Sequence, residues 1–225
     1  MLKAIGIQKY YGDLQVLKGV DVEIFENEVV SIVGASGAGK STLLHILGTL
    51  DHADKGEVWI DNIPISKLKG DKLADFRNSQ IGFIFQFHNL LPEFTAAENI
   101  IIPGLVARKS APLLRKRASE LAELLGFSGR LEHKPSELSG GEQQRVAVAR
   151  ALINDPKIIF ADEPSGNLDS HNAQALHGLF FTLRENFGQT FVIVTHNQDL
   201  AKMADRTLTM QDGTILSMNR NVKNI

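Results

Sequence analysis

The fold is decided by the stretch Gly34-Ala35-Ser36-Gly37-Ala38-Gly39-Lys40-Ser41, which fits the pattern G-x-x-x-x-G-K-[ST] over its whole length. It directly follows residues 29–33, a β-branched run typical of a buried strand. Leucines then recur at helical spacing, which predicts a helix over residues 41–50. A glycine loop between a strand and a helix predicts a phosphate cradle, because its backbone N–H groups and the positive end of the helix point at anionic oxygens.

The loop ends in two side chains that have chemistry of their own. We predict that Lys40 reaches the β- and γ-phosphates of a nucleotide and that the Ser41 hydroxyl binds Mg²⁺ directly. The alternative is a glycine-rich turn that binds no ligand. The position of the loop between a strand and a helix favours the phosphate cradle.

Two acids follow another apolar run. Residues 157–161 form a predicted strand, and Asp162 and Glu163 come at its carboxyl end. Asp162 is expected to hold Mg²⁺ through water, and Glu163 to polarise the attacking water. Neighbouring strand residues point to opposite sides, so the two acids can have separate roles. The alternative is a strand that simply ends in a solvated turn, and the phosphate loop upstream favours the catalytic interpretation.

A second anion site is predicted further along the chain. Ser139, Gly140 and Gly141 come just before a predicted helix over residues 141–154. A hydroxyl, free N–H groups and a helix dipole together suit a phosphate. The alternative is a serine that only caps the helix.

The run around these residues is similar to the signature of a known family: Leu138-Ser139-Gly140-Gly141-Glu142-Gln143-Gln144-Arg145. It resembles the LSGGQ or LSGGE, followed by QR, of the ABC ATPases, and the resemblance covers essentially the whole chain. It implies an α/β fold with a P-loop NTPase (RecA-like) core, an N-terminal antiparallel β subdomain and an α-helical insertion. The expected organisation is a single domain over 1–225, with 1–87 and 151–225 forming the core and β subdomain and 88–150 the helical subdomain.

The resemblance also implies a homodimer. In the family the signature segment, here Ser139 to Gln143, binds the γ-phosphate held by the opposite protomer, so that two ATP molecules are buried between two subunits. The family loop that communicates across the dimer corresponds to Ser165-Gly166-Asn167-Leu168-Asp169. Its first position is serine, where related proteins usually have threonine.

Further site residues follow from the resemblance alone. Tyr11 corresponds to the aromatic residue that stacks on adenine, with Tyr10 as a close competitor. Thr42 belongs to the phosphate loop. Gln86 matches the glutamine that senses Mg²⁺ and the attacking water, and His196 matches the histidine that contacts the γ-phosphate. Each of the last two has the ordinary alternative of a surface or structural residue.

One segment narrows the family: Gln86-Phe87-His88-Asn89-Leu90-Leu91-Pro92-Glu93-Phe94-Thr95-Ala96-Ala97-Glu98-Asn99-Ile100. It resembles the LolD-type ATPases of lipoprotein-releasing systems, a subfamily shared with MacB-type exporters and the division ATPase FtsE. In the family this surface receives a helix of the membrane subunit. Phe87, Leu90, Leu91 and Phe94 would supply the apolar area for such LolC/LolE-like permease partners. The alternative is that they fill the core of the insertion.

Composition limits the remaining classes of function. The 225 residues carry a net charge of −2, which gives no case for a nucleic-acid surface, and no cysteine, which excludes disulfides and thiolate chemistry. No run of apolar residues is long enough to span a bilayer. A membrane role therefore requires a partner, and the expected location is peripheral, on the cytoplasmic face of the inner membrane. MacB carries its own membrane helices, so a chain ending at Ile225 favours a separate ATPase subunit.

The resulting hypothesis is an ATPase that uses ATP and Mg²⁺ to power lipoprotein release toward the outer membrane. A MacB-like exporter or FtsE-like division complex is the alternative within the subfamily. Less favoured are an ABC ATPase working on DNA or ribosomes, a P-loop kinase of small molecules and a binding module without catalysis.

Overall fold

The computed structural model describes residues 1–221. The chain divides into two compact units. The first unit comprises residues 1–74 and 182–221, and the second comprises residues 75–181. The predicted single domain with a helical part over 88–150 stays a prediction.

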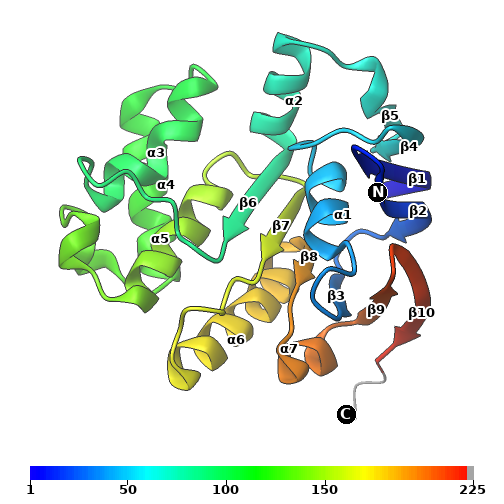
Figure 1. The fold of residues 1–225 in the computed structure, drawn as a ribbon. Helices are drawn as coiled ribbons and strands as arrows, with labels where there is room; N and C mark the ends of the chain where they lie inside the picture. The colour runs from blue at the N-terminus through cyan, green and yellow to red at the C-terminus, as the bar shows by residue number, and fades with distance from the viewer. Residues whose placement is uncertain (222–225) are drawn as a thin grey trace. The chain divides into compact units, whose positions relative to one another are not determined.

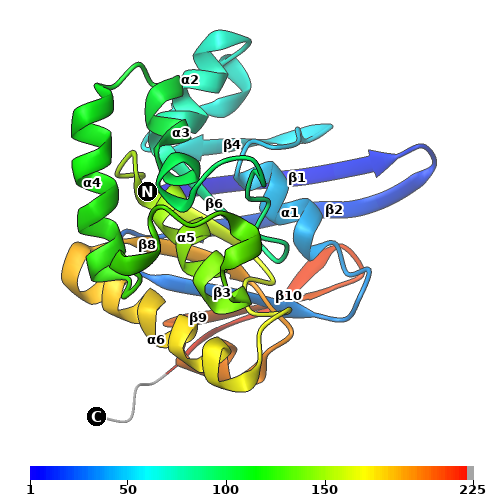
Figure 2. The same cartoon turned by 90° about the vertical axis from the view of Figure 1, so that its left-hand side faces the viewer.

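The first unit contains an antiparallel sheet with the strand order β2-β1-β4-β5. Its strands are β1 (Leu2–Tyr11), β2 (Leu14–Ile24), β4 (Lys55–Ile60) and β5 (Ile63–Pro64). β1 and β2 form a long two-stranded ribbon (Figure 2). Buried and exposed positions alternate along much of β1, as expected for a sheet with one face on a core.

A second set of strands in the first unit has the order β10-β9-β3-β8. β3 (Val29–Gly34) pairs in parallel with β8 (Thr190–Val194) and with β9 (Arg206–Gln211), and β9 forms a hairpin with β10 (Thr214–Arg220). Every residue of β8 is buried, which explains its unbroken apolar and β-branched sequence.

The helices of the first unit follow the strands. α1 (Lys40–Leu47) comes after β3, and α7 (Gln198–Met203) comes after β8. A 3₁₀ turn, η1 (Ile65–Lys67), follows β5. The sequence predicted α1 to extend to residue 50, but Gly48 is its C-cap and Thr49 has a φ of 64°, so the helix ends there.

The second unit has two parallel strands and three packed helices. β6 (Ile81–Phe85) pairs with β7 (Ile158–Asp162). α3 (Ala96–Val106), α4 (Ala111–Leu124) and α5 (Gly140–Leu152) pack against one another (Figure 1). Short 3₁₀ turns, η2 (Ser128–Arg130) and η3 (Pro135–Glu137), connect α4 to α5.

α5 also packs on β6, and a glycine permits the contact. A Cβ at Gly82 would lie 2.8 Å from the Ala151 carbonyl oxygen, so only glycine allows this approach. Two helices cross the boundary between the units, α2 (Asp71–Gln80) and α6 (Ser170–Phe187). None of the helices within residues 1–221 is long and apolar enough to cross a membrane.

One fully buried amide organises the start of α3. Asn99 has no exposed surface, and its Oδ1 accepts the Leu91 N–H at 2.8 Å. Its Nδ2 donates to the carbonyl oxygens of Leu91, Phe94 and Thr95 at 3.0–3.1 Å. The side chain therefore holds the irregular segment before the helix by both its donor and its acceptor.

Replacing Asn99 with alanine is expected to lower the free energy of unfolding by about 2–3 kcal/mol, because buried backbone groups lose their partners. Denaturant titration measures the change. Asn219→Ala is the control, since Asn219 is exposed on β10 and a change of about 0.5 kcal/mol or less is expected there. Equal losses in the two variants would contradict this role of Asn99.

Candidate functional site

The predicted phosphate loop lies between β3 and α1 in the first unit. Gly34, Gly37 and Gly39 have φ angles of 153°, 79° and 94°, a region that side chains strongly disfavour. A Cβ at Gly34 would overlap the Met210 carbonyl oxygen, and one at Gly39 would lie 2.9 Å from Leu17 Cδ2. The tight loop therefore depends on glycine both for its backbone and for its packing.

The glycines are expected to differ in their tolerance of alanine. Gly34→Ala must displace backbone, so we expect a loss of about 3 kcal/mol in the free energy of unfolding. A Cβ at Gly37 would meet no atom of residues 1–221 within 4 Å, and Gly37→Ala is expected to cost about 1 kcal/mol from its left-handed backbone alone. Denaturant titration without nucleotide measures the free energy of unfolding of both variants. A larger loss for Gly37→Ala than for Gly34→Ala would contradict the packing argument.

The start of α1 is electrostatically positive. Its N-cap is Gly39, which offers no side-chain cap, and its first turn contains no acidic residue. The first N–H groups of a helix have no intrahelical partner. Lys40 Nζ donates to the carbonyl oxygens of Gly34 and Ala35, both at 2.9 Å, so its charge lies over the loop. This donor set fits a phosphate chain.

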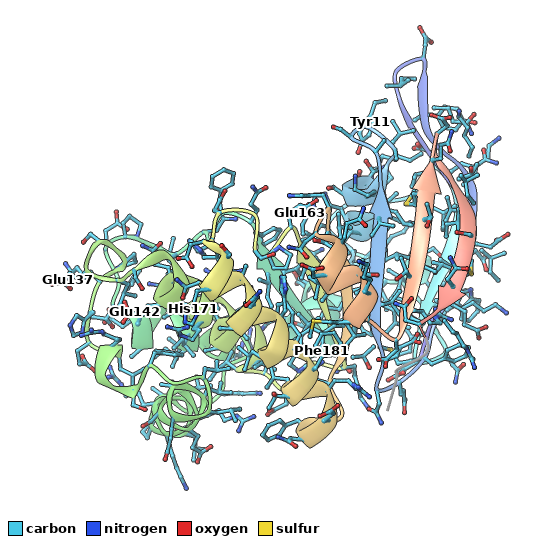
Figure 3. All side chains as sticks on the ribbon, turned by 90° about the horizontal axis from the view of Figure 1, so that it is seen from below. Tyr11, Glu137, Glu142, Glu163, His171 and Phe181 are labelled. Atoms are coloured by element: carbon cyan, nitrogen blue, oxygen red, sulfur yellow. The ribbon has the colours of Figure 1, made fainter. Side chains whose placement is uncertain are left out.

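Tyr11 ends β1, close to the tip of the β1–β2 hairpin (Figure 3). Its side chain is 53% exposed, and Lys9 Nζ lies 5.2 Å from the ring centroid. Its hydroxyl donates to Asp51 Oδ2 at 2.9 Å, and this hydrogen bond raises the pKa of Tyr11. Tyr10 is less exposed and donates to Gln8 Oε1 at 3.1 Å. Exposure favours Tyr11 as the ring available to a nucleobase.

His196 is exposed between β8 and α7. The turn around it is firmly held, because Asn197 N–H donates to Thr195 Oγ1 at 3.0 Å and the Asn197 side chain caps α7. His196 and Gly34 line one cavity of about 450 Å³ in the first unit, together with Thr195. The structure therefore brings the predicted histidine to the first residue of the phosphate loop.

Asp162 is the last residue of β7, and Glu163 lies just beyond the strand. Glu163 has a φ of 47°, a left-handed conformation that is costly for a residue with a side chain. The alternation of strand side chains therefore does not set its direction, contrary to the sequence-based reasoning. Glu163 instead begins a turn, which is closed by the Gly166 N–H bond to the Glu163 carbonyl oxygen at 3.0 Å.

The loop after Glu163 is held by side chains from two helices, α5 and α6. Gln144 of α5 is fully buried, and its Nε2 donates to the Pro164 carbonyl oxygen at 2.8 Å. His177 of α6 places Nε2 3.0 Å from Ser165 Oγ. From the sequence, Gln144 was only a member of the signature run, and His177 had only the default interpretation of a structural or surface histidine.

Gln86 meets the same loop. Its Nε2 donates to Asn167 Oδ1 at 3.1 Å, and Asn167 Nδ2 donates back to the Gln86 carbonyl oxygen at 3.1 Å. A Cβ at Gly166 would lie 2.8 Å from Gln86 Nε2, so the glycine makes room for this amide. The predicted magnesium-sensing glutamine and the predicted dimer-communicating loop are thus directly joined within one unit.

The signature segment starts α5. Ser139 is its N-cap and forms a capping box with Glu142: the Glu142 N–H donates to Ser139 Oγ at 3.3 Å, and the Ser139 N–H donates to Glu142 Oε2 at 2.8 Å. Gln143 Nε2 donates to the carbonyl oxygens of Pro135 and Leu138. A Cβ at Gly141 would lie 2.5 Å from Asn172 Oδ1, so the glycine makes room for this side chain.

The candidate metal ligands are oxygen donors from different parts of the chain: Ser41, Gln86 and Asp162. Hydroxyl, amide and carboxylate oxygens suit Mg²⁺. In the described part of the chain, no group of three or more histidine or acidic side chains could hold a metal ion by itself.

The apolar segment before α3 is largely exposed. Phe87, Leu91 and Phe94 are 70%, 43% and 41% exposed, while Leu90 is half-buried. The backbone of this segment is fixed, because Arg150 donates to the carbonyl oxygens of His88 and Asn89, both at 2.7 Å. The alternative that these side chains fill the core is wrong for the three exposed ones.

Known proteins resemble this chain over nearly its full length. Two are named lipoprotein-releasing system ATP-binding protein LolD, from Bacteroides thetaiotaomicron and Cytophaga hutchinsonii. Each is 60% identical, and each match covers 96% of this chain and 99% of the relative. A protein of the same name from Bdellovibrio bacteriovorus is 48% identical over 94% of this chain and 98% of its own.

Solved structures of ABC transporter cassettes are also similar to this chain. The dimeric structure of a bacterial ABC transporter cassette has a TM-score of 0.91 and 42% identity, with 99% of both chains covered. A dimeric post-hydrolysis state of that cassette, bound to ADP and Pi, has a TM-score of 0.89 and 41% identity, again with 99% of both chains covered. These likenesses confirm the predicted α/β fold of a P-loop NTPase. The family model described as ABC transporter matches residues 17–166, more than half of the sequence. The chain therefore belongs to the ABC transporter family.

Proposed function

We propose that this chain is the peripheral ATPase subunit of a transporter that releases lipoproteins from the inner membrane. The observation that carries the proposal is the glycine loop before α1. The positive start of this helix and the Lys40 side chain suit a nucleoside triphosphate. The assignment of lipoproteins as the cargo is supported by the 60% identity to proteins named for lipoprotein release. The proposed location is the cytoplasmic face of the membrane, where ATP is available.

We propose that two copies of the chain form a homodimer and share two ATP molecules. In each copy, Tyr11 stacks on the adenine while residues 34–42 hold the phosphates. Residues 139–143 of the other copy close over the γ-phosphate. The capped and glycine-rich start of α5 supports this role, and a related cassette was solved as a dimer.

For hydrolysis, we propose that Glu163 polarises the attacking water and that Gln86 and His196 help to place it. Ser41, Asp162 and Gln86 would hold Mg²⁺, which neutralises charge on the phosphates when bound. Little covalent chemistry is asked of the protein, so positioning and electrostatic stabilisation provide the rate. The left-handed Glu163 supports this assignment, since strained backbone is concentrated at functional sites.

The apolar segment is proposed as the docking surface for the membrane-embedded permease subunits. Phe87→Ser is expected to reduce co-purification with these subunits by about tenfold, because a large exposed aromatic is a typical interface anchor. Leu113→Ser is the matched control: Leu113 is 68% exposed on α4, against 70% for Phe87. Equal recovery of the permease with Phe87→Ser and with the unaltered chain would contradict this docking site.

The whole function is tested by reconstitution. The chain and its permease subunits are placed in lipid vesicles with a lipid-anchored protein, and a soluble lipoprotein carrier is added outside. ATP-dependent transfer of the anchored protein to the carrier is expected, with no transfer when ATP is replaced by ADP. Vigorous ATP hydrolysis without any transfer would contradict lipoprotein release while leaving the ATPase assignment intact.

A further inference from the structure

The signature segment carries a negative charge beside the proposed phosphate site. Glu142 lies in the first turn of α5, and its side chain is 18% exposed. The hydrogen bond from Arg130, followed by that from the Ser139 N–H, lowers the pKa of Glu142 to about 2. The carboxylate therefore stays ionised throughout the physiological range, and protonation cannot remove its charge.

An ionised carboxylate and an incoming γ-phosphate repel each other. The repulsion would matter in the proposed dimer, because burying the γ-phosphate between two subunits would weaken screening by solvent and salt. If residues 139–143 are to close over a phosphate, the charge of Glu142 must be neutralised by a neighbour. Within residues 1–221 the structure provides that neighbour: Arg130 Nε donates to Glu142 Oε1 at 2.8 Å.

Arg130 is held in place by the backbone around it. It ends η2, where its N–H donates to the Phe127 carbonyl oxygen at 2.9 Å and its own carbonyl accepts the His133 N–H at 3.0 Å. Phe127 is buried, and the start of α3 is bonded to the same loop through the Ala96 N–H and the His133 carbonyl oxygen at 2.8 Å. The hydrogen-bonded turn therefore holds the Arg130 guanidinium against the Glu142 carboxylate.

A purely stabilising role explains this pair poorly. Arg130 is 48% exposed, and exposed ion pairs contribute little to stability. Glu142 would cap the Ser139 N–H through Oε2 without any help from Arg130. What Arg130 adds is a positive charge on the other carboxylate oxygen, next to the N-terminus of α5.

We propose that Arg130 is a positioning residue for ATP-dependent dimer closure, which it permits by neutralising Glu142 at the signature segment. The inference rests on the proposed function, in which residues 139–143 cover the γ-phosphate of the other copy. Arg130 acts through Glu142 and does not contact the nucleotide. Removing Arg130 should therefore be harmful only while residue 142 carries a negative charge.

The test measures the ATP concentration that half-saturates dimer formation. Light scattering follows dimerisation with MgATP in a Glu163→Gln background, which prevents turnover. Adding Arg130→Gln is expected to raise this concentration by about tenfold, through the uncompensated charge. Adding Glu142→Gln to Arg130→Gln is expected to return it to within about threefold of the background value, because the amide keeps the capping oxygen and loses the charge.

Arg117→Gln in the same background is the matched control. Arg117 forms a comparable ion pair with Asp155, at 2.6 Å, and is 38% exposed on α4. It is expected to change the half-saturating concentration by less than about twofold, since it lies outside the signature segment. Salt supplies a second readout: the penalty of Arg130→Gln is expected to shrink as ionic strength rises.

The possible failures are distinguishable. If Glu163→Gln alone never dimerises with MgATP, the proposed function fails and the role of Arg130 fails with it. If it dimerises and Arg130→Gln leaves the ATP requirement unchanged, only the role of Arg130 is overturned. If Arg130→Gln raises the requirement and Glu142→Gln does not restore it, Arg130 supports the fold or contacts phosphate directly, and neutralisation of Glu142 is overturned.

Discussion

Glu163→Gln is expected to lower the rate of ATP hydrolysis by about 10³-fold, because the amide cannot accept a proton from the attacking water. The substitution keeps the size and hydrogen-bonding shape of the side chain, so binding of MgATP should persist. The variant is therefore expected to accumulate as an ATP-bound dimer. Phosphate release measures the rate, and size-exclusion chromatography with MgATP measures the dimer.

Glu123→Gln is the control for this prediction. Glu123 is exposed on α4, so the same loss of charge away from the site should leave hydrolysis within about twofold of the unaltered chain. Hydrolysis by Glu163→Gln at more than about a tenth of the original rate would remove this residue from the role of general base.

Lys40→Met is expected to weaken MgATP binding by about 10²-fold, since a cation held against a triphosphate contributes roughly 3 kcal/mol. In the structure Lys40 Nζ is already positioned over the loop by the carbonyl oxygens of Gly34 and Ala35. Methionine keeps the length of the side chain and removes the charge. Titration calorimetry with MgATP gives the affinity directly.

A second lysine variant separates this local effect from net charge. Lys116 is exposed on α4, and Lys116→Met is expected to leave nucleotide affinity within about twofold. The stability of both variants should remain close to that of the unaltered chain. Nucleotide affinity that is unchanged in Lys40→Met would refute the assignment of residues 34–42 as the phosphate loop.

Local sequence was informative wherever the chemistry is contiguous along the chain. The phosphate loop, the Asp162–Glu163 pair and the start of α5 each combine short-range backbone geometry with the side chains that use it. Strand, turn and helix propensities act over a few residues, so these pieces could be predicted one at a time. The fold class followed from the resemblance of these motifs to those of the ABC ATPases.

The helices α2, α3 and α7 were not predicted from the sequence, and each for a physical reason. α2 has no buried residue and so lacks an apolar stripe. α3 is apolar on most sides and contains Pro103, so neither periodicity nor propensity marks it. α7 is only six residues long and depends on its Asn197 cap and its buried Leu200 and Ala201. The apolar periodicity of an amphipathic helix is therefore missing or too short to recognise in each of the three.

The sequence alone therefore predicted which residues bind phosphate and indicated which family the chain belongs to, because both signals lie in short contiguous motifs. Tertiary structure alone decided how the motifs are supported. Asn99 hydrogen-bonds to the apolar segment, Gln144 hydrogen-bonds to the loop after Glu163, and Arg130 hydrogen-bonds to Glu142 from a separate turn. These contacts join residues that are 8 to 20 positions apart along the chain. Only the folded backbone brings such residues within hydrogen-bonding distance, and no local pattern records the pairing.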